Sequence, residues 1–141
     1  MYRYSHLVQL YETDLMGIVH HANYLRFLEE SRVSWAHSAG MLDYQNHESA
    51  SHLAVIETQV KHIKPAYFGD HLEIQLQAMK KGIRIIFEYK VICKKRNDEV
   101  IVEARTVHAP LNKELKLIRL PEKISSVLEK ELWTETWLSS L

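Results

Sequence analysis

The stretch that best indicates the fold is LEIQLQAMKKGIRIIFEYKVICK, residues 72–94. Apolar and polar side chains alternate through Leu72–Ala78, and the same period returns in Ile83–Cys93. Because successive side chains of a strand point to opposite faces, each half predicts a strand with one buried face. Lys81-Gly82 separates the halves and is short enough to join them as an antiparallel hairpin.

The remaining elements follow from the same periods and from helix-ending residues. In all, strands are predicted at residues 4–11, 53–63, 71–79, 83–94 and 99–109. A helix is predicted over Tyr24–Ala39, with Asn23 as its N-cap and Gly40 just after its C-terminus. Residues 42–51 are polar, and we expect them to be irregular.

Each of two predicted helices carries an apolar stripe. The stripe of the first comprises Tyr24, Phe27, Leu28, Ser31, Trp35 and Ala39. The second is predicted to have Pro121 in its first position, with a stripe of Ile124, Val127, Leu128 and Leu132. Since helices do not alternate with strands, we predict an α+β fold in which a curved antiparallel sheet wraps around the first helix. The 141 residues fit one domain, 1–141.

The composition argues against several classes of protein. Lys and Arg total 18 and Asp and Glu total 18, so no basic excess points to nucleic acid. No run approaches the roughly 18 apolar residues of a membrane span, and Met1–His6 lacks the apolar core of a secretory signal. The single cysteine, Cys93, has no internal disulfide partner, which suits a cytoplasmic protein.

The residues most suited to chemistry lie in YETDLMGIVHHANY, residues 11–24. Asp14 precedes a helix, whose free N–H groups and positive dipole end can stabilise a carboxylate or an oxyanion on a substrate. Gly17 allows a positive φ that other residues resist. From this bare pattern, Asp14 as a simple cap of the loop or helix stays open as the alternative.

Several short motifs occur in a recognisable order. They are Thr13-Asp14, Gly17-Ile18-Val19, Asn23-Tyr24-Leu25-Arg26-Phe27, Glu29-Glu30, Trp35, Lys64-Pro65-Ala66, Gly69-Asp70 and Leu120-Pro121-Glu122-Lys123-Ile124. Together they cover nearly the whole chain, which resembles the hotdog-fold acyl-CoA thioesterases of the 4-hydroxybenzoyl-CoA/YbgC-like family. His20 departs from the pattern, because that family usually has Tyr or Trp at this position.

The resemblance implies a hotdog fold and hydrolysis of acyl-CoA thioesters without a metal or organic cofactor. It implies Asp14 as the catalytic carboxylate, either general base or nucleophile, and the backbone N–H of His21 as the oxyanion donor. Gly17, His20 and Tyr24 are expected to contact the substrate. It also implies that two chains pair, as a homodimer or a doubled homotetramer, with each site at the shared interface.

The phosphates of CoA require cations near the site. Lys81 and Lys116 are the residues we expect to bind them, with Lys80, Arg84 and Lys113 as further candidates at turns or strand ends.

Other chemistries have weaker signals. His20 and His21 are expected to point opposite ways on an extended segment, and no metal motif occurs, so no metal site is predicted. There is no G-x-S-x-G motif, and Glu29-Glu30 is expected to be solvated helix surface. Two alternatives to hydrolysis stay open: a non-catalytic acyl-CoA binding or sensing module, and a hydratase or dehydratase that uses His21 with Asp14.

Overall fold

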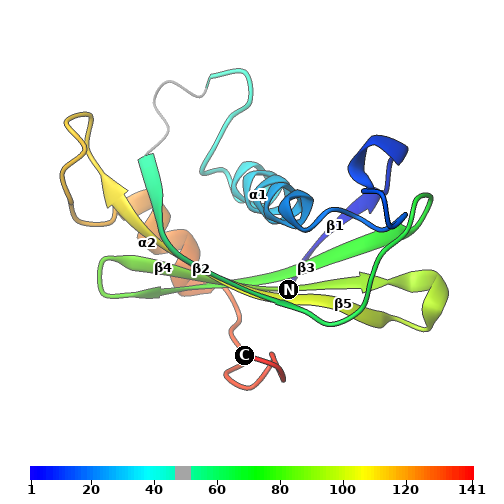
Figure 1. The fold of residues 1–141 in the computed structure, drawn as a ribbon. Helices are drawn as coiled ribbons and strands as arrows, with labels where there is room; N and C mark the ends of the chain where they lie inside the picture. Colours follow the sequence, from blue (N-terminus) through cyan, green and yellow to red (C-terminus); the bar gives the residue numbers. More distant parts are fainter. Residues whose placement is uncertain (47–51) are drawn as a thin grey trace.

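A computed structural model describes residues 1–46 and 52–141. The elements in chain order are β1 (Tyr2–Leu7), the 3-10 turn η1 (Leu10–Glu12), α1 (His21–Ser38), β2 (His52–His62), β3 (His71–Lys81), β4 (Arg84–Cys93), the 3-10 turn η2 (Lys94–Arg96), β5 (Glu99–Leu111) and α2 (Glu122–Lys130). Figure 1 shows one curved sheet with α1 across one face and the C-terminal residues on the other. None of the helices in the described ranges is long and apolar enough to cross a membrane.

All five strands belong to one antiparallel sheet, in the order β1-β3-β4-β5-β2. The predicted hairpin is confirmed, because Lys81 of β3 pairs with Arg84 of β4. The predicted alternation is confirmed too, since Leu72, Ile74, Leu76 and Ala78 are all buried.

The core lies between the sheet and one side of α1. The buried residues of this helix are Tyr24, Phe27, Leu28, Ser31 and Trp35, five members of the predicted stripe. Trp35 meets Phe87 of β4 edge to face, with ring centroids 5.3 Å apart. The sheet therefore wraps around the helix as predicted, and this is the hotdog arrangement.

The first predicted strand, 4–11, ends early in the structure, at Leu7. Leu7 pairs with His71, the first residue of β3, so the sheet offers no partner strand beyond it. The chain then bends: the Val8 N–H donates to the Asp70 carbonyl, and η1 follows.

The start of α1 differs from the prediction. The helix begins at His21, and His20 is its N-cap, because His20 Nδ1 accepts the Ala22 N–H at 3.1 Å. The prediction of Asn23 as N-cap is wrong, since Asn23 Nδ2 donates to the Glu12 carbonyl at 2.8 Å. At the other end Gly40, with φ +77°, follows the C-cap Ala39 as predicted.

The second helix also differs in detail. Pro121 is its N-cap rather than its first residue, and the helix ends at Lys130. Leu132 therefore lies outside the helix and is 81% exposed, so the prediction that it belongs to the apolar stripe was wrong. Ile124 and Leu128 of the stripe are buried. Of the segment expected to be irregular, residues 42–46 contain neither helix nor strand, and 47–51 lie outside the described residues.

The C-terminal part of the chain covers the half of β3 that β1 leaves unpaired. β1 pairs only as far along β3 as Leu76. Beyond that point α2 packs against β3, where Lys80 Nζ binds Ser125 at 2.7 Å and Glu129 at 2.6 Å. The tail then crosses to the outer face of the sheet, where backbone N–H groups of Ser139 and Ser140 bind the buried Glu103 carboxylate.

Candidate active site

The segment between η1 and α1 is a tight loop. Thr13 and Val19 form an antiparallel bridge, the Asp14 N–H donates to the Ile18 carbonyl at 2.9 Å, and the Gly17 N–H donates to the Asp14 carbonyl at 3.0 Å. Gly17 has φ +79°, in the left-handed region that residues with a Cβ rarely adopt. The sequence therefore needs glycine here to turn the chain back toward α1.

This loop holds the Asp14 side chain at the edge of a cavity. Asp14 Oδ1 accepts the Met16 N–H at 2.8 Å, which fixes the direction of the half-buried carboxylate. The cavity has a volume of about 410 Å³ and is lined by Asp14, Ile18, Val19, His21, Tyr24, His62, Ile63, Lys64 and Pro65. Residues from the loop, from the N-terminus of α1 and from the end of β2 thus meet around one carboxylate.

The N-terminus of α1 faces the same cavity through His21. His21 is the first helical residue, and no acceptor for its backbone N–H occurs within residues 1–46 and 52–141. Such an N–H lies at the positive end of the helix dipole, where an oxyanion is stabilised. The His20 and His21 rings stack with centroids 4.3 Å apart, so the expectation that they point opposite ways was wrong, because His21 already belongs to the helix.

Two further ionisable side chains of the cavity are perturbed by burial. Burial raises the pKa of Tyr24 to about 12, although an Ala66 backbone hydrogen bond lowers it, so its hydroxyl stays protonated and can donate at neutral pH. Burial and the nearby His21 lower the pKa of His62, which favours its neutral form. The Tyr24 and His62 rings have centroids 5.5 Å apart.

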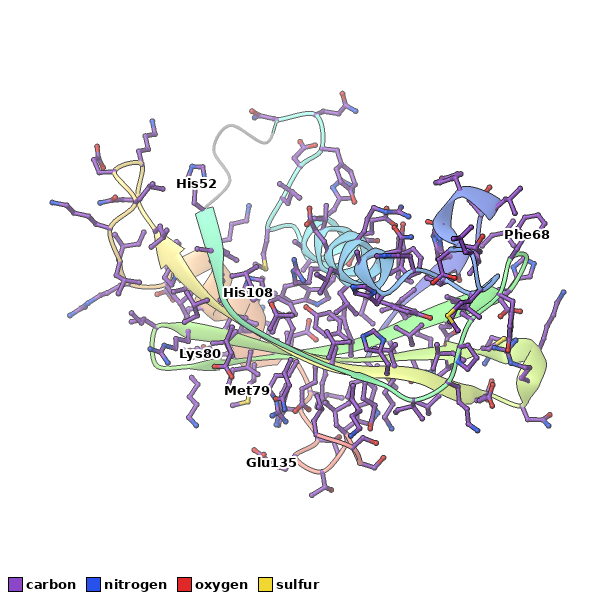
Figure 2. All side chains as sticks on the ribbon, viewed as in Figure 1. His52, Phe68, Met79, Lys80, His108 and Glu135 are labelled. Carbon is purple, nitrogen blue, oxygen red and sulfur yellow. The ribbon has the colours of Figure 1, made fainter. Side chains whose placement is uncertain are left out.

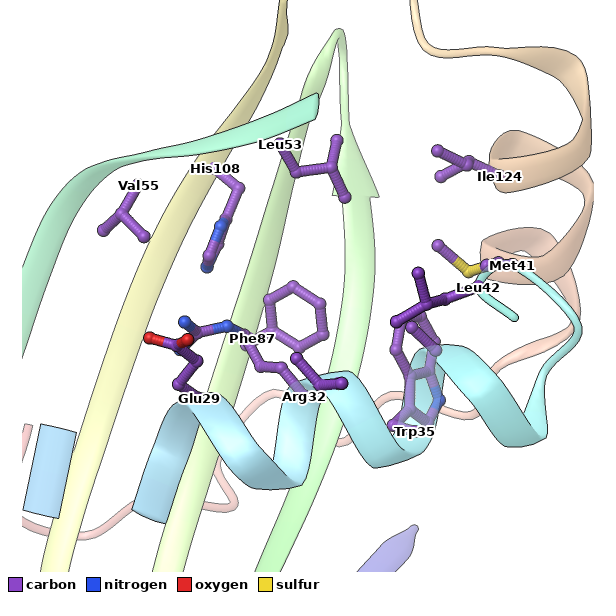
Figure 3. A pocket seen from close by; sticks show the side chains of 12 residues that line it. Glu29, Arg32, Trp35, Met41, Leu42, Leu53, Val55, Phe87, His108 and Ile124 are labelled. Carbon is purple, nitrogen blue, oxygen red and sulfur yellow. The ribbon is translucent and has the colours of Figure 1, made fainter. Parts of the chain in front are cut away.

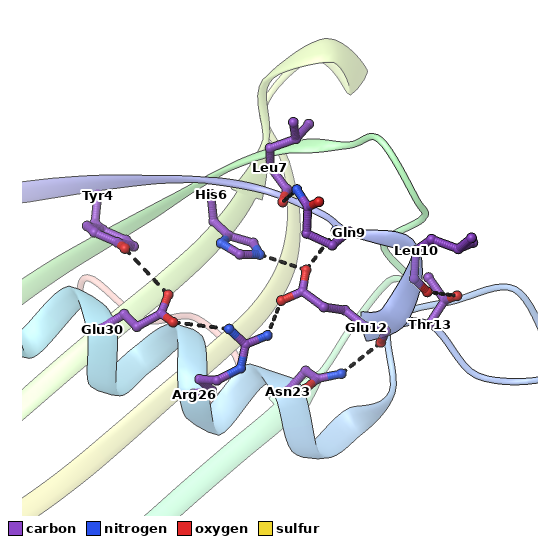
Figure 4. Close-up of polar contacts among 10 residues, drawn as sticks. All are labelled: Tyr4, His6, Leu7, Gln9, Leu10, Glu12, Thr13, Asn23, Arg26 and Glu30. Carbon is purple, nitrogen blue, oxygen red and sulfur yellow. Dashed lines mark hydrogen bonds and ion pairs between the residues drawn. The ribbon is translucent and has the colours of Figure 1, made fainter.

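The loop is held to α1 by a buried carboxylate that sequence analysis missed. Figure 4 shows Glu12 Oε1 accepting from the Gln9 N–H at 2.7 Å and from His6 Nε2 at 2.8 Å, while its second oxygen pairs with Arg26 of α1. Burial raises the pKa of Glu12, but the Gln9 N–H, His6 and Arg26 outweigh it and hold the pKa below its usual value. The available signal was the spacing Gln9-x-x-Glu12, that of a capping box.

The comparisons with known proteins identify the family of the chain. A sequence profile described as the thioesterase-like superfamily matches residues 8–128. The chain belongs to the thioesterase-like superfamily. It is therefore an enzyme of the thioester-hydrolase class.

The matches to individual relatives cover most of this thioesterase and most of each relative. A protein of Aquifex aeolicus named "Putative esterase" is 30% identical over 126 residues, which cover 89% of this chain and 96% of that protein. A 1,4-dihydroxy-2-naphthoyl-CoA hydrolase of Synechococcus elongatus is 24% identical, with 91% and 95% covered. The crystal structure of a 1,4-dihydroxy-2-naphthoyl-CoA thioesterase from Synechocystis has the same fold, with a TM-score of 0.81, 24% identity and 91% and 95% covered.

The structure brings together only some of the predicted site residues of the thioesterase. Asp14, His21 and Tyr24 line the cavity, whereas Gly17 and His20 shape the loop and the helix cap without lining it. His62–Pro65 line it from β2 and the segment that follows. Sequence analysis missed these residues as a group because they are distant in the chain from Asp14, His21 and Tyr24.

The predicted phosphate-binding lysines lie far from Asp14 in the same chain. Lys81 ends β3, whereas the Asp14 loop lies by the start of β3, about 30 Å away along the strand. Lys116 lies in the turn after β5, where its N–H binds Asn112 Oδ1 at 3.0 Å. Figure 2 shows Lys80 and Phe68 at opposite ends of the sheet. Lys81 and Lys116 could therefore serve an Asp14 site only in another copy of the chain.

In the described part of the chain, no group of three or more His, Cys, Asp or Glu side chains is arranged to hold a metal ion. Cys93 is buried at the end of β4.

Proposed function

We propose that the protein is an acyl-CoA thioesterase of the 4-hydroxybenzoyl-CoA/YbgC-like type, with Asp14 as its catalytic carboxylate. The observation that supports this most directly is the shared cavity, in which the Asp14 carboxylate and the free N–H end of α1 lie together. A carboxylate that takes a proton and an N–H that receives an oxyanion are the two groups that thioester hydrolysis needs.

The proposed reaction is a water attack on the thioester carbonyl. Asp14 accepts a proton from the water as the new C–O bond forms, and the His21 N–H stabilises the oxyanion. Collapse of the tetrahedral intermediate then breaks the C–S bond and releases CoA as the thiol, with the proton returned from Asp14, and the free acid. Base assistance accounts for about 10²–10⁴-fold of the rate and one oxyanion donor for about 10²–10³-fold.

We also propose that the active protein is a homodimer or homotetramer. Strand β2 lies at one edge of the sheet, and Val55 and Ile56 on it are 49% and 48% exposed. An edge strand of this length with exposed apolar side chains is suited to pairing with a second chain. Because His62 at the end of β2 lines the Asp14 cavity, a second copy on this edge would lie beside the site. A cytoplasmic location stays a prediction of the sequence.

The test of Asp14 uses two asparagine variants. Asp14→Asn is expected to fold, to bind acyl-CoA and to lose about 10²–10⁴-fold in kcat. Asp43→Asn is the matched control, because Asp43 Oδ1 accepts the Gln45 N–H at 2.9 Å in the same kind of turn but lies outside the cavity. Release of free thiol from a panel of acyl-CoAs measures kcat and names the preferred acyl group.

Other outcomes would contradict the assignment. Full activity of Asp14→Asn, or loss of activity in Glu29→Gln instead, would move the catalytic carboxylate away from Asp14. Binding of acyl-CoA by the unmodified protein without thiol release would favour a binding or sensing module. Addition of water to an enoyl-CoA without thiol release would favour the hydratase alternative.

A further inference from the structure

The cap of α1 is a histidine, a residue whose charge changes near neutral pH. His20 Nδ1 accepts the Ala22 N–H at 3.1 Å, and the His20 carbonyl accepts the Asn23 N–H at 2.9 Å. The His20 N–H in turn donates to the Glu12 carbonyl at 2.9 Å. His20 therefore makes hydrogen bonds to both sides of the junction between the Asp14 loop and the helix.

These bonds leave one particular donor of the first turn free. The first N–H groups of a helix have no partner within the helix. In α1 the ring of His20 takes the Ala22 N–H and its carbonyl takes the Asn23 N–H. The His21 N–H has no acceptor in the part of the chain that the structure describes. The cap thus leaves the His21 N–H as the donor that an oxyanion can use.

The later turns of α1 are fixed by packing against the sheet. Figure 3 shows Trp35 and Phe87 between the helix and the strands, where their rings meet edge to face with centroids 5.3 Å apart. By contrast, His20, His21 and Ala22 are all exposed. Since burial does not hold the first turn, its position depends on the hydrogen bonds at the cap.

The cap bond requires a neutral imidazole. A ring nitrogen that accepts a hydrogen bond carries no proton, so the proton of the neutral His20 ring lies on Nε2. A proton added at Nδ1 places two N–H donors opposite each other. The ring must then turn away from the Ala22 N–H, and the first turn of the helix loses its side-chain cap.

The titratable groups around His20 offer no replacement for the cap. The His21 ring stacks on the His20 ring, with centroids 4.3 Å apart. The other titratable residues that line the cavity with His21 are Asp14, Tyr24, His62 and Lys64. The Glu12 carboxylate is already bound by His6 and Arg26. Among residues 1–46 and 52–141, no carboxylate forms an ion pair with His20, so protonation gains no counterion.

We propose that His20 is a positioning residue that makes the hydrolysis dependent on pH. The neutral ring caps the first turn and holds the His21 N–H where the oxyanion forms. Protonation releases the cap, and kcat falls. This inference rests on the proposed function, because the His21 N–H has its task in that reaction. His20 replaces the usual Tyr or Trp of the family, whose side chains do not change charge between pH 5 and 8.

The first test measures kcat and KM with octanoyl-CoA and benzoyl-CoA at pH 7.5 and pH 5.5, with free CoA quantified by chromatography. The unmodified protein is expected to lose about fivefold in kcat at the lower pH with KM unchanged, which is the effect of one lost helix cap. His20→Asn provides a good cap that does not titrate, so its kcat is expected to change by less than about twofold between the two pH values. His20→Ala is expected to be about fivefold slower at pH 7.5 and to lose no more at pH 5.5.

The matched control is His37→Asn. His37 is an exposed histidine in the last turn of the same helix, outside the Asp14 cavity. This variant is expected to keep the pH dependence of the unmodified protein.

A second readout does not require hydrolysis. The amide proton shift of Ala22 reports the cap bond, and NMR is expected to show it moving together with the His20 ring signals between pH 8 and pH 5. An Ala22 shift that does not follow His20 would overturn the proposal. So would the full pH dependence of kcat in His20→Asn, or full activity of His20→Ala at pH 7.5. If the cap titrates as expected but neither acyl-CoA nor the wider panel is hydrolysed at any pH, the proposed function fails, and the catalytic task of His20 fails with it.

Discussion

At the scale of single residues, Glu12 shows how a buried charge can position a site. The residue is only 1% exposed, and such burial disfavours a carboxylate unless other groups compensate. The Gln9 N–H, His6 and Arg26 provide that compensation, and the Glu12 carbonyl accepts in addition from the His20 N–H and the Asn23 side chain. Glu12 thereby links β1, the Asp14 loop and the start of α1.

Glu12→Gln is therefore expected to destabilise the protein. The variant leaves His6 and Arg26 without their carboxylate, although Arg26 keeps Glu30 at 3.1 Å, so we expect a loss of about 2 kcal/mol in the free energy of unfolding at pH 7. Urea unfolding measures it, with the exposed Glu114→Gln as control. Equal stability of the two variants would show that the buried carboxylate is not needed.

The pH dependence follows from the sign of the Glu12 shift. The pKa of Glu12 in the folded protein lies below its usual value, so the folded state favours the ionised form. This contribution is fully present above the unfolded pKa of about 4.3 and is lost as the pH falls through the folded pKa. The difference in stability between the natural protein and Glu12→Gln is thus expected to shrink below about pH 4. A difference in stability that stayed constant down to low pH would argue against a lowered pKa of Glu12 in the folded protein.

At the scale of elements, the loop before α1 depends on its glycine. Gly17 with φ +79° and Gly40 with φ +77° stand near opposite ends of α1 in the same left-handed conformation. A Cβ would meet no atom within 4 Å at either position, so the cost of alanine is one of backbone conformation alone. The two glycines differ in what they position: Gly17 turns the chain that carries Asp14.

Gly17→Ala and Gly40→Ala are expected to lose similar stability but to differ in activity. Each should lower the free energy of unfolding by about 1 kcal/mol. Only Gly17→Ala should also lower kcat, because it displaces the Asp14 carboxylate relative to the His21 N–H. Thermal unfolding and thiol release measured on both variants give the result. An equal loss of kcat in both would mean that the Gly17 turn does not position Asp14.

At the scale of the whole molecule, the two edges of the sheet differ in what packs against them. α2 packs along the part of β3 that β1 leaves unpaired. At the opposite edge, β2 pairs with β5 on one side only. Its register shifts between Val55 and Glu57, and Val55 and Ile56 are among the exposed apolar residues. The β2 edge is thus the side of the molecule best suited to self-association.

Ile56→Lys is expected to produce monomers. A charge on this edge opposes pairing with a second strand, while the half-exposed side chain leaves the core intact. Sedimentation velocity measures the assembly, and thiol release shows whether activity falls with it. Glu57→Lys is the control for adding a lysine to the same strand. A fully active monomer in the unmodified protein would contradict a site shared between chains.

Much of the fold follows from local pattern. The alternation in Leu72–Ala78 and Ile83–Cys93, the stripe of α1 and the position of Gly40 are properties of neighbouring residues, because a strand or helix repeats at a fixed short period. Asp14, His21 and Tyr24 lie within eleven residues, Asp14 to Tyr24, around one helix start, and the resemblance to a known family is what associated them from the sequence.

What only the tertiary structure decided is which distant groups meet. Asn23 has the residue type of an N-cap, yet it binds the Glu12 carbonyl and leaves the cap to His20. From the sequence, Lys80 is a lysine near a turn that could bind a phosphate, but in the structure it pairs with Glu129 of α2. A hydrogen bond or ion pair forms with whatever group the fold brings within reach, and no local period records it. The sequence by itself determined the order and type of the elements and the segment that carries Asp14, because these depend on neighbouring residues. Packing decided where the elements begin and end and which partner each charge has.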